Sequence, residues 1–98
     1  MTVPVFIGDE LSAAGYRLAG VRAWTPNADE LLSVFRRARE EADLILLNVE
    51  YARRLPAVEV LEAQRALQPQ LFIIPDIRHQ HPMRDLLSRI HNQLGMQP

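Results

Sequence analysis

The chain contains no cysteine and no lysine, and each absence removes a class of chemistry. Without cysteine there can be no disulfide and no thiolate metal site, and the sequence is compatible with a reducing compartment. Without lysine there is neither a Schiff-base nucleophile nor the lysine of a phosphate-binding loop. Apart from histidine, all 11 basic residues are arginine, a side chain that suits planar, bidentate contacts at interfaces.

Long apolar runs and a strong net charge are also missing. The aliphatic stretch at residues 44–47 is far shorter than the ~20 residues that span a bilayer. The first residues lack the pattern of a signal peptide. A net charge of −1 favours neither nucleic acid nor an acidic membrane surface. We therefore expect a cytoplasmic protein that neither inserts into the membrane nor binds nucleic acid.

Short apolar runs alternate with amphipathic segments, which predicts an α/β fold over a single domain, residues 1–98. Such alternation favours a parallel sheet with helices on both faces. The predicted strands are rich in aliphatic residues and are bounded by glycine, proline or polar residues; they comprise residues 3–7, 21–24, 43–49 and 71–74.

Caps and breakers place the helices between these strands. Asp9 caps the first helix and Gly20 ends it, while Thr25 or Asn27 caps a second helix that runs to about residue 42. An irregular turn is expected after the third strand. Two prolines suit the first turn of the remaining helices, Pro56 and Pro82.

Apolar periodicity defines the predicted core. In the first helix, Leu11, Ala14 and Leu18 share one face, which leaves Tyr16 and Arg17 beside it as candidates for exposure. The last helix carries an apolar stripe at helical spacing, made of Met83, Leu86, Leu87, Ile90 and Leu94. The core is expected to contain Val5, Ile7, Leu18, Leu31, Phe35, Ile45, Leu47, Leu61, Ile73, Leu86 and Ile90.

Polar residues follow the first and third strands, whose carboxyl ends flank the crevice where open parallel sheets bind ligands. Asp9, Glu10 and Asn48 could place two carboxylates near an amide and hold a magnesium ion through oxygen ligands. Alternatively, Asp9 and Glu10 complete the start of a helix and Asn48 caps a turn. The sequence leaves both interpretations open.

No catalytic pattern emerges elsewhere. The glycines match neither nucleotide-binding fingerprint, and the serines and threonines offer no nucleophilic triad. His79 and His81 share one polar loop, without an evident third metal ligand. We therefore expect a protein that is not an enzyme and that carries no cofactor and no metal.

The chain closely resembles the F-subunits of the rotary V/A-type ATPases. The strongest part is Gly8-Asp9 followed by Gly-Tyr-Arg-Leu-Ala-Gly-Val at residues 15–21, which is similar to a Gly-Phe-Arg-Leu-Ala-Gly-Val-like run in that family. The similarity continues through the strand at residues 43–47, Ile73-Ile74-Pro75 and the final Leu94-Gly95. The resemblance implies a four-stranded sheet in the order 2-1-3-4.

The resemblance also implies a function. The F-subunit is a non-catalytic central-stalk (rotor) component that couples ATP hydrolysis or synthesis to ion transport by docking on a coiled-coil shaft, the D-subunit. The chain would then be peripheral to the membrane through that complex. Arginine and aromatic anchors dominate many interfaces, so the candidate contact residues are Tyr16, Arg17, Trp24, Arg84, Arg89 and His91. Trp24 ends a predicted edge strand, which could accept a strand from another chain.

A second resemblance is to response-regulator receiver domains. Residues 42–49 look like the receiver strand that ends in a phosphorylated aspartate, and Asp9-Glu10 look like its acidic pair. Asn48 stands at the acceptor position, however, and the chain has no lysine to fill the receiver's lysine position. This alternative therefore predicts a degenerate, receiver-like adaptor domain without a phospho-acceptor.

Overall fold

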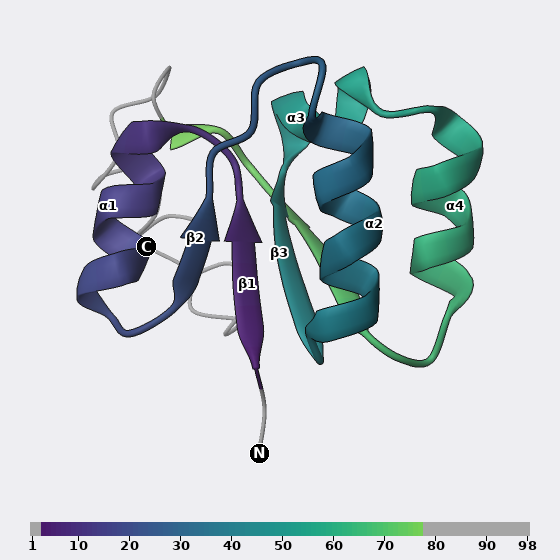
Figure 1. The fold of residues 1–98 in the computed structure, drawn as a ribbon, viewed down its shortest axis with the longest axis horizontal. Coiled ribbons are helices and arrows are strands. Elements are labelled where there is room, and N and C mark those ends of the chain that lie inside the picture. Colours follow the sequence, from purple (N-terminus) through teal and green to yellow (C-terminus); the bar gives the residue numbers. More distant parts are fainter. Residues whose placement is uncertain (1–2, 78–98) are drawn as a thin grey trace, which may run out of the picture.

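The computed structural model describes residues 3–77, which form four strands and four helices (Figure 1). The last predicted helix, with Leu86 and Ile90, lies outside the described residues. In chain order the elements are β1 (Pro4–Ile7), α1 (Glu10–Leu18), β2 (Arg22–Trp24), α2 (Leu31–Glu41), β3 (Leu44–Asn48), α3 (Val49–Arg54), α4 (Ala57–Arg65) and β4 (Gln70–Ile74).

The strands form one parallel sheet in the order β2-β1-β3-β4, which confirms the predicted fold and strand order. The sheet is in register across all four strands, so that Phe6 lies beside both Ala23 and Leu46, and Leu46 beside Phe72. In Figure 1, α1 stands at the β2 end of the sheet, whereas α2 and α4 stand together toward the other end.

The larger core lies between the sheet and α2. Val5, Ile7, Ile45 and Leu47 point to this face from the two central strands, and each is fully buried. Side chains from the apolar stripe of α2 pack against them, as its 3.6-residue spacing predicts: Leu31, Phe35 and Ala38. These positions confirm the central part of the predicted core.

The opposite face of the sheet carries a smaller core under α1. Phe6 is fully buried there together with Ala13 and Ala23. The Tyr16 ring stacks on the Phe6 ring, with centroids 4.4 Å apart and 17° between the ring planes. Because successive strand residues point to opposite faces of the sheet, Phe6 packs in this smaller core, while its neighbours Val5 and Ile7 pack in the larger one.

Three predicted core residues are exposed. Leu18 is 91% exposed, Leu61 46% and Ile73 37%. The predicted stripe of α1 is wrong because the helix is rotated so that Ala13 and Tyr16 face Phe6, which turns Leu18 to solvent. Leu61 and Ile73 belong to α4 and β4 at the edge of the sheet, where neighbours lie on one side only.

Two local predictions also need correction. The expected irregular turn after β3 is the short helix α3, which the side chain of Asn48 caps. The predicted cap of the second helix at Thr25 or Asn27 is wrong, since α2 begins at Leu31 with Glu30 as its N-cap and no side-chain cap bond. Here a backbone turn, in which Glu30 N–H donates to the Asn27 carbonyl over 3.0 Å, leads into the helix.

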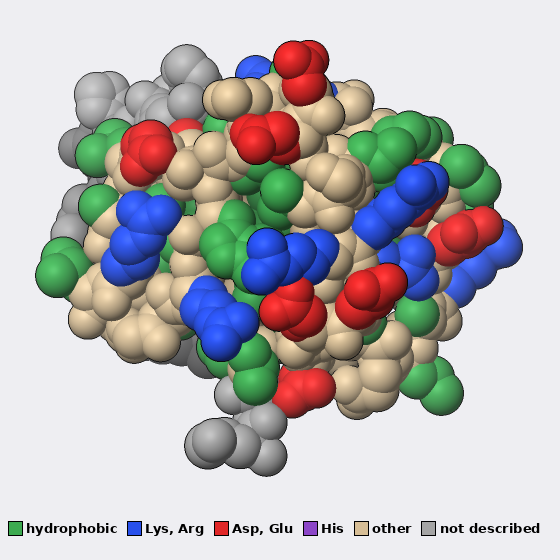
Figure 2. Space-filling model, viewed as in Figure 1, with side chains coloured by type: hydrophobic (Ala, Val, Ile, Leu, Met, Phe, Trp, Pro, Cys, Tyr) green, Lys and Arg blue, Asp and Glu red, His purple; other side chains and the backbone are tan. Residues whose placement is uncertain are grey.

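An ion pair joins α2 to α4 across the surface on which acidic and basic side chains intermingle (Figure 2). Arg36 of α2 pairs with Glu59 of α4, whereas Arg37 pairs within α2 with Glu41, its neighbour at helical spacing. The hydrogen bond from Arg36 lowers the pKa of the Glu59 carboxyl. The pair therefore stabilises the fold at pH values above the ordinary pKa of glutamate and loses this effect as the pH falls through the lowered value.

Candidate partner-binding surface

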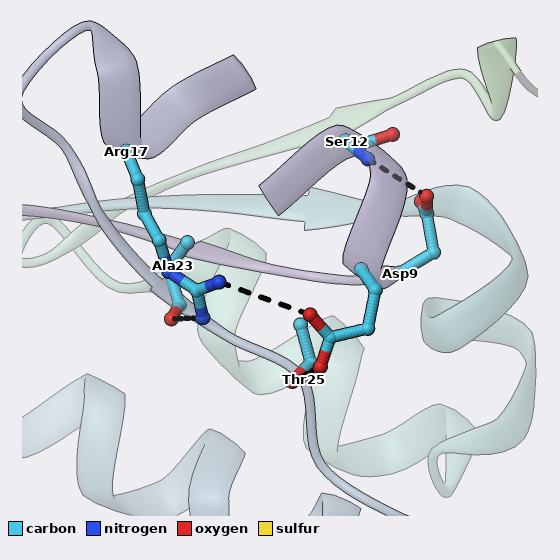
Figure 3. Close-up of polar contacts among 6 residues, drawn as sticks. Asp9, Ser12, Arg17, Ala23 and Thr25 are labelled. Atoms are coloured by element: carbon cyan, nitrogen blue, oxygen red, sulfur yellow. Dashed lines mark hydrogen bonds and ion pairs between the residues drawn. The ribbon is translucent and has the colours of Figure 1, made fainter. Parts of the chain in front are cut away.

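The crevice between β1 and β3 is built from helix caps. Asp9 is 4% exposed, and its Oδ2 accepts a hydrogen bond from the Ser12 N–H over 2.9 Å at the start of α1 (Figure 3). Its Oδ1 lies 3.4 Å from the Asn48 Nδ2 donor. The Asn48 side chain in turn accepts from the Glu50 N–H over 2.7 Å at the start of α3. These buried polar groups thus satisfy the backbone N–H groups that helix ends leave unpaired.

Of the two interpretations that the sequence left open, the structure does not favour a magnesium site, because the Asp9 and Glu10 carboxylates diverge. Glu10 turns toward β2, where it accepts a hydrogen bond from the Thr25 hydroxyl over 2.7 Å. Its second oxygen lies 3.8 Å from Arg17. Within residues 3–77, no group of three histidine, aspartate or glutamate side chains could hold a metal ion. The capping interpretation of Asp9 and Asn48 is therefore confirmed.

The Gly-Tyr-Arg-Leu-Ala-Gly-Val run forms the end of α1 and the turn into β2. Gly20 has φ of 86°, in the left-handed region that glycine favours. Its N–H donates to the Arg17 carbonyl and the Val21 N–H donates to the Tyr16 carbonyl, each over 3.0 Å. These two bonds make the Schellman motif, which satisfies the last carbonyls of the helix.

Replacing Gly20 with alanine should lower the free energy of unfolding by about 1–2 kcal/mol, because a Cβ clashes with the backbone in the left-handed conformation. Asparagine tolerates this conformation better, so Gly20→Asn should cost less than Gly20→Ala. Urea denaturation of the three proteins measures both differences. Equal stability of wild type and Gly20→Ala would contradict the assignment of the turn.

Arg17 reaches from α1 to β2. Its guanidinium donates to the Ala23 carbonyl over 2.8 Å, and the side chain remains 50% exposed (Figure 3). The neighbouring carbonyl of Trp24 bonds to the Gly8 N–H after β1, so the Ala23 carbonyl faces the free edge of the sheet. Arg17 therefore covers part of this edge, as charged side chains do on other exposed strands. Strand addition at β2 would have to displace it.

The aromatic candidates are less exposed than the sequence indicated. Tyr16 is half-buried on Phe6, and burial raises the pKa of its phenol. Trp24 is half-buried against the larger core, and the Arg37 guanidinium lies 5.2 Å from its ring centroid. Tyr16 thus contributes mainly to packing, whereas Trp24 is partly exposed and contacts Arg37.

The structure brings several of these groups together around β2. We call Glu10, Arg17, Trp24, Thr25 and Arg37 the β2 surface. Sequence reasoning missed Glu10, Thr25 and Arg37 as members, because their contacts join residues from separate elements. The remaining candidate residues, namely His79, His81, Arg84, Arg89 and His91, lie outside the described residues.

A comparison with protein families bears on what this surface does. Residues 5–90 match the model of the ATP synthase (F/14-kDa) subunit, and the match spans both the capped crevice and the β2 turn. The chain belongs to this family. Its members are the F-subunits of the V/A-type ATP synthases, as the residues around Gly8-Asp9 and the β2 turn predicted. A search of curated proteins found no significant match.

Family membership decides between the two resemblances noted in the sequence. The F-subunit match covers most of the chain, and the position of the receiver phospho-acceptor is held by Asn48, which is 1% exposed and caps α3. Separately, among the described helices there is none whose length and apolar character would let it cross a bilayer.

Proposed function

We propose that this chain is a non-catalytic central-stalk component of a V/A-type rotary ATPase and that it docks on the coiled-coil shaft, the D-subunit. The family match over residues 5–90 carries the proposal. In this role the chain is cytoplasmic, lies peripheral to the membrane through the complex and helps to couple ATP hydrolysis or synthesis to ion transport.

The architecture of the described residues suits a part that transmits torque. A rotor component must deform little under load, and close-packed interiors have low compressibility. The central strands β1 and β3 are fully buried from Val5 to Ile7 and at Ile45 and Leu47, with a packed layer on each side. The caps at Asp9 and Asn48 further fix the start of α1 and α3 against this sheet.

We further propose that the β2 surface contributes to the contact with the shaft. Arg17 and Arg37 are exposed and are positioned by their contacts with the Ala23 carbonyl and the Trp24 ring. An arginine held in place loses little side-chain entropy on binding, and arginine and tryptophan are enriched among interface residues with large energetic effects. Arg84, Arg89 and His91 stay as additional candidates on the basis of the sequence.

Co-expression with the coiled-coil stalk protein from the same source tests the proposal. We expect a one-to-one complex on gel filtration at micromolar concentration. Arg17→Ala and Trp24→Ala should each weaken it by ~10-fold or more, which corresponds to about 1.4 kcal/mol. Arg65→Ala is the matched control, since Arg65 lies on α4 at the opposite end of the sheet and should leave affinity unchanged.

Circular dichroism of each variant separates loss of contact from loss of fold. Clean separation of the two wild-type proteins on gel filtration would overturn the proposed partner. A stable complex that tolerates both Arg17→Ala and Trp24→Ala would keep the partner but exclude the β2 surface as its docking site.

A further inference from the structure

The two edges of the sheet differ in how well they are protected. An edge strand presents unpaired N–H and C=O groups, which can pair with another chain unless charged side chains, proline or a bulge protect them. At β2 the Arg17 guanidinium already binds the Ala23 carbonyl. In contrast, β4 contains no charged residue, and within residues 3–77 no strand pairs with its outer side. The edge at β4 is therefore the less protected of the two.

The backbone of β4 turns two of its residues outward. The Gln70 N–H donates to the Asp43 carbonyl over 3.1 Å, so Gln70 faces β3. Because successive residues of a strand direct their N–H and C=O groups to opposite sides, Leu71 and Ile73 face the outer edge. The residues that flank the strand are both proline and have no N–H. The outer edge of β4 thus offers two donors and two acceptors.

Apolar side chains are exposed on both sides of this edge. Phe72 lies on the same face of the sheet as Phe6, and it is 51% exposed. Ile73 points to the opposite face and is 37% exposed. There it lines a hollow of about 470 Å³ together with Leu61 of α4, which is 46% exposed. A strand that pairs with β4 would remove part of this apolar surface from water, which favours pairing.

We propose that β4 pairs in antiparallel orientation with β4 of a second copy of this chain, around a twofold axis at Phe72. In this register Leu71 of each copy lies opposite Ile73 of the other, and the two residues of such a pair exchange two hydrogen bonds. All the outward N–H and C=O groups of β4 are then paired. The two Phe72 residues face each other as a non-hydrogen-bonded pair, in which cross-strand side chains lie closest.

A copy of the same strand fits this edge because β4 is self-complementary. Its five residues are uncharged, so no like charges meet across the axis. A twofold contact uses the same surface on both molecules and closes at two copies. The paired edge is short, so we expect a weak dimer with a dissociation constant on the order of 100 µM. The inference does not depend on the proposed partner, since β2 and β4 are opposite ends of the sheet.

Disulfide trapping tests the register directly, because the natural chain contains no cysteine. The Cα atoms of a non-hydrogen-bonded pair are about 4.5 Å apart, which a disulfide can span. Full-length Phe72→Cys should therefore form a covalent dimer when it is oxidised above the expected dissociation constant. Gln70→Cys is the matched control: Gln70 is exposed on the same strand but would face Ile74 of the second copy, so it should cross-link at least ~10-fold more slowly. Equal cross-linking rates would overturn the proposed register.

Sedimentation equilibrium of the full chain measures the association itself. As the concentration rises from about 10 µM to about 1 mM, the average mass of the wild type should increase from 11.2 kDa toward twice that value. Phe72→Lys places like charges opposite each other and should weaken association at least ~10-fold. Leu18→Lys adds the same charge at a residue of α1 that is 91% exposed, and it should leave association unchanged. Circular dichroism checks that both variants fold. A wild type that stays monomeric at about 1 mM, or a dimer that tolerates Phe72→Lys, would contradict the proposal.

Discussion

Replacing Ile45 with alanine is expected to lower the free energy of unfolding by about 2–5 kcal/mol, the largest effect of a single truncation that we predict. Ile45 is fully buried in β3, between Val5 on β1 and Leu71 on β4. The strand is paired on both sides, so the surrounding residues can move little to fill the space that the lost methyl groups leave. The cost therefore includes both lost burial and the residual cavity.

Leu18→Ala provides the matched control for this experiment. Both residues belong to the core that the sequence predicts, but Leu18 is 91% exposed in the structure. Its truncation should change stability by less than about 0.5 kcal/mol. Urea denaturation followed through Trp24, the single tryptophan of the chain, measures both values. A cost below about 0.5 kcal/mol for Ile45→Ala would mean that β3 is not the central strand.

Gly8→Ala is expected to destabilise the fold by about 1–3 kcal/mol through overpacking. A Cβ at this position would collide with Cζ of Phe6 and would lie 2.9 Å from Cβ of Asn48. Phe6 and Asn48 are both buried, and Asn48 also caps α3, so neither can move away at low cost. The glycine of the Gly8-Asp9 pair is thus required by close packing at the crevice rather than by backbone conformation.

A double-mutant cycle isolates the clash. Phe6→Leu removes the ring atoms nearest to the added methyl group, so Gly8→Ala should cost less in the Phe6→Leu background than in the wild type. The contact with Asn48 remains, so some destabilisation should persist. Additive effects of the two substitutions would show that the Phe6 ring is not what excludes a side chain at position 8.

Much of the structure follows from local features of the sequence. The strand β3 was predictable because four consecutive aliphatic residues are typical of a strand that is covered on both faces. The end of α1 at Gly20 was predictable because a residue in the left-handed conformation, usually glycine, commonly ends a helix. The stripe of α2 was predictable for a similar reason, since Leu31, Phe35 and Ala38 recur at helical spacing. The parallel strand order came from the resemblance to the F-subunits.

Only the tertiary structure decided which face of α1 is buried. Leu11 and Leu18 are more apolar than Ala13, but the Phe6 ring already fills the space beneath the helix, where only a small residue and a stacked Tyr16 fit. The same contacts turned a predicted surface aromatic into a packing residue. Apolar periodicity cannot predict which face of α1 is buried, because it compares the faces of one helix and contains no information about the shape of the sheet on which the helix packs.

For the candidate partner-binding surface, too, some features could be predicted from the sequence and others only from the tertiary structure. Glycine stops, the capping aspartate and the arginine of the signature run are visible in the sequence, because each acts within a few residues of its own position. Three contacts could not be read from the sequence: Arg17 with the Ala23 carbonyl, Glu10 with Thr25, and Arg37 with the Trp24 ring. Each joins two elements whose relative position depends on the packing of the whole sheet, and so only the assembled fold determines it.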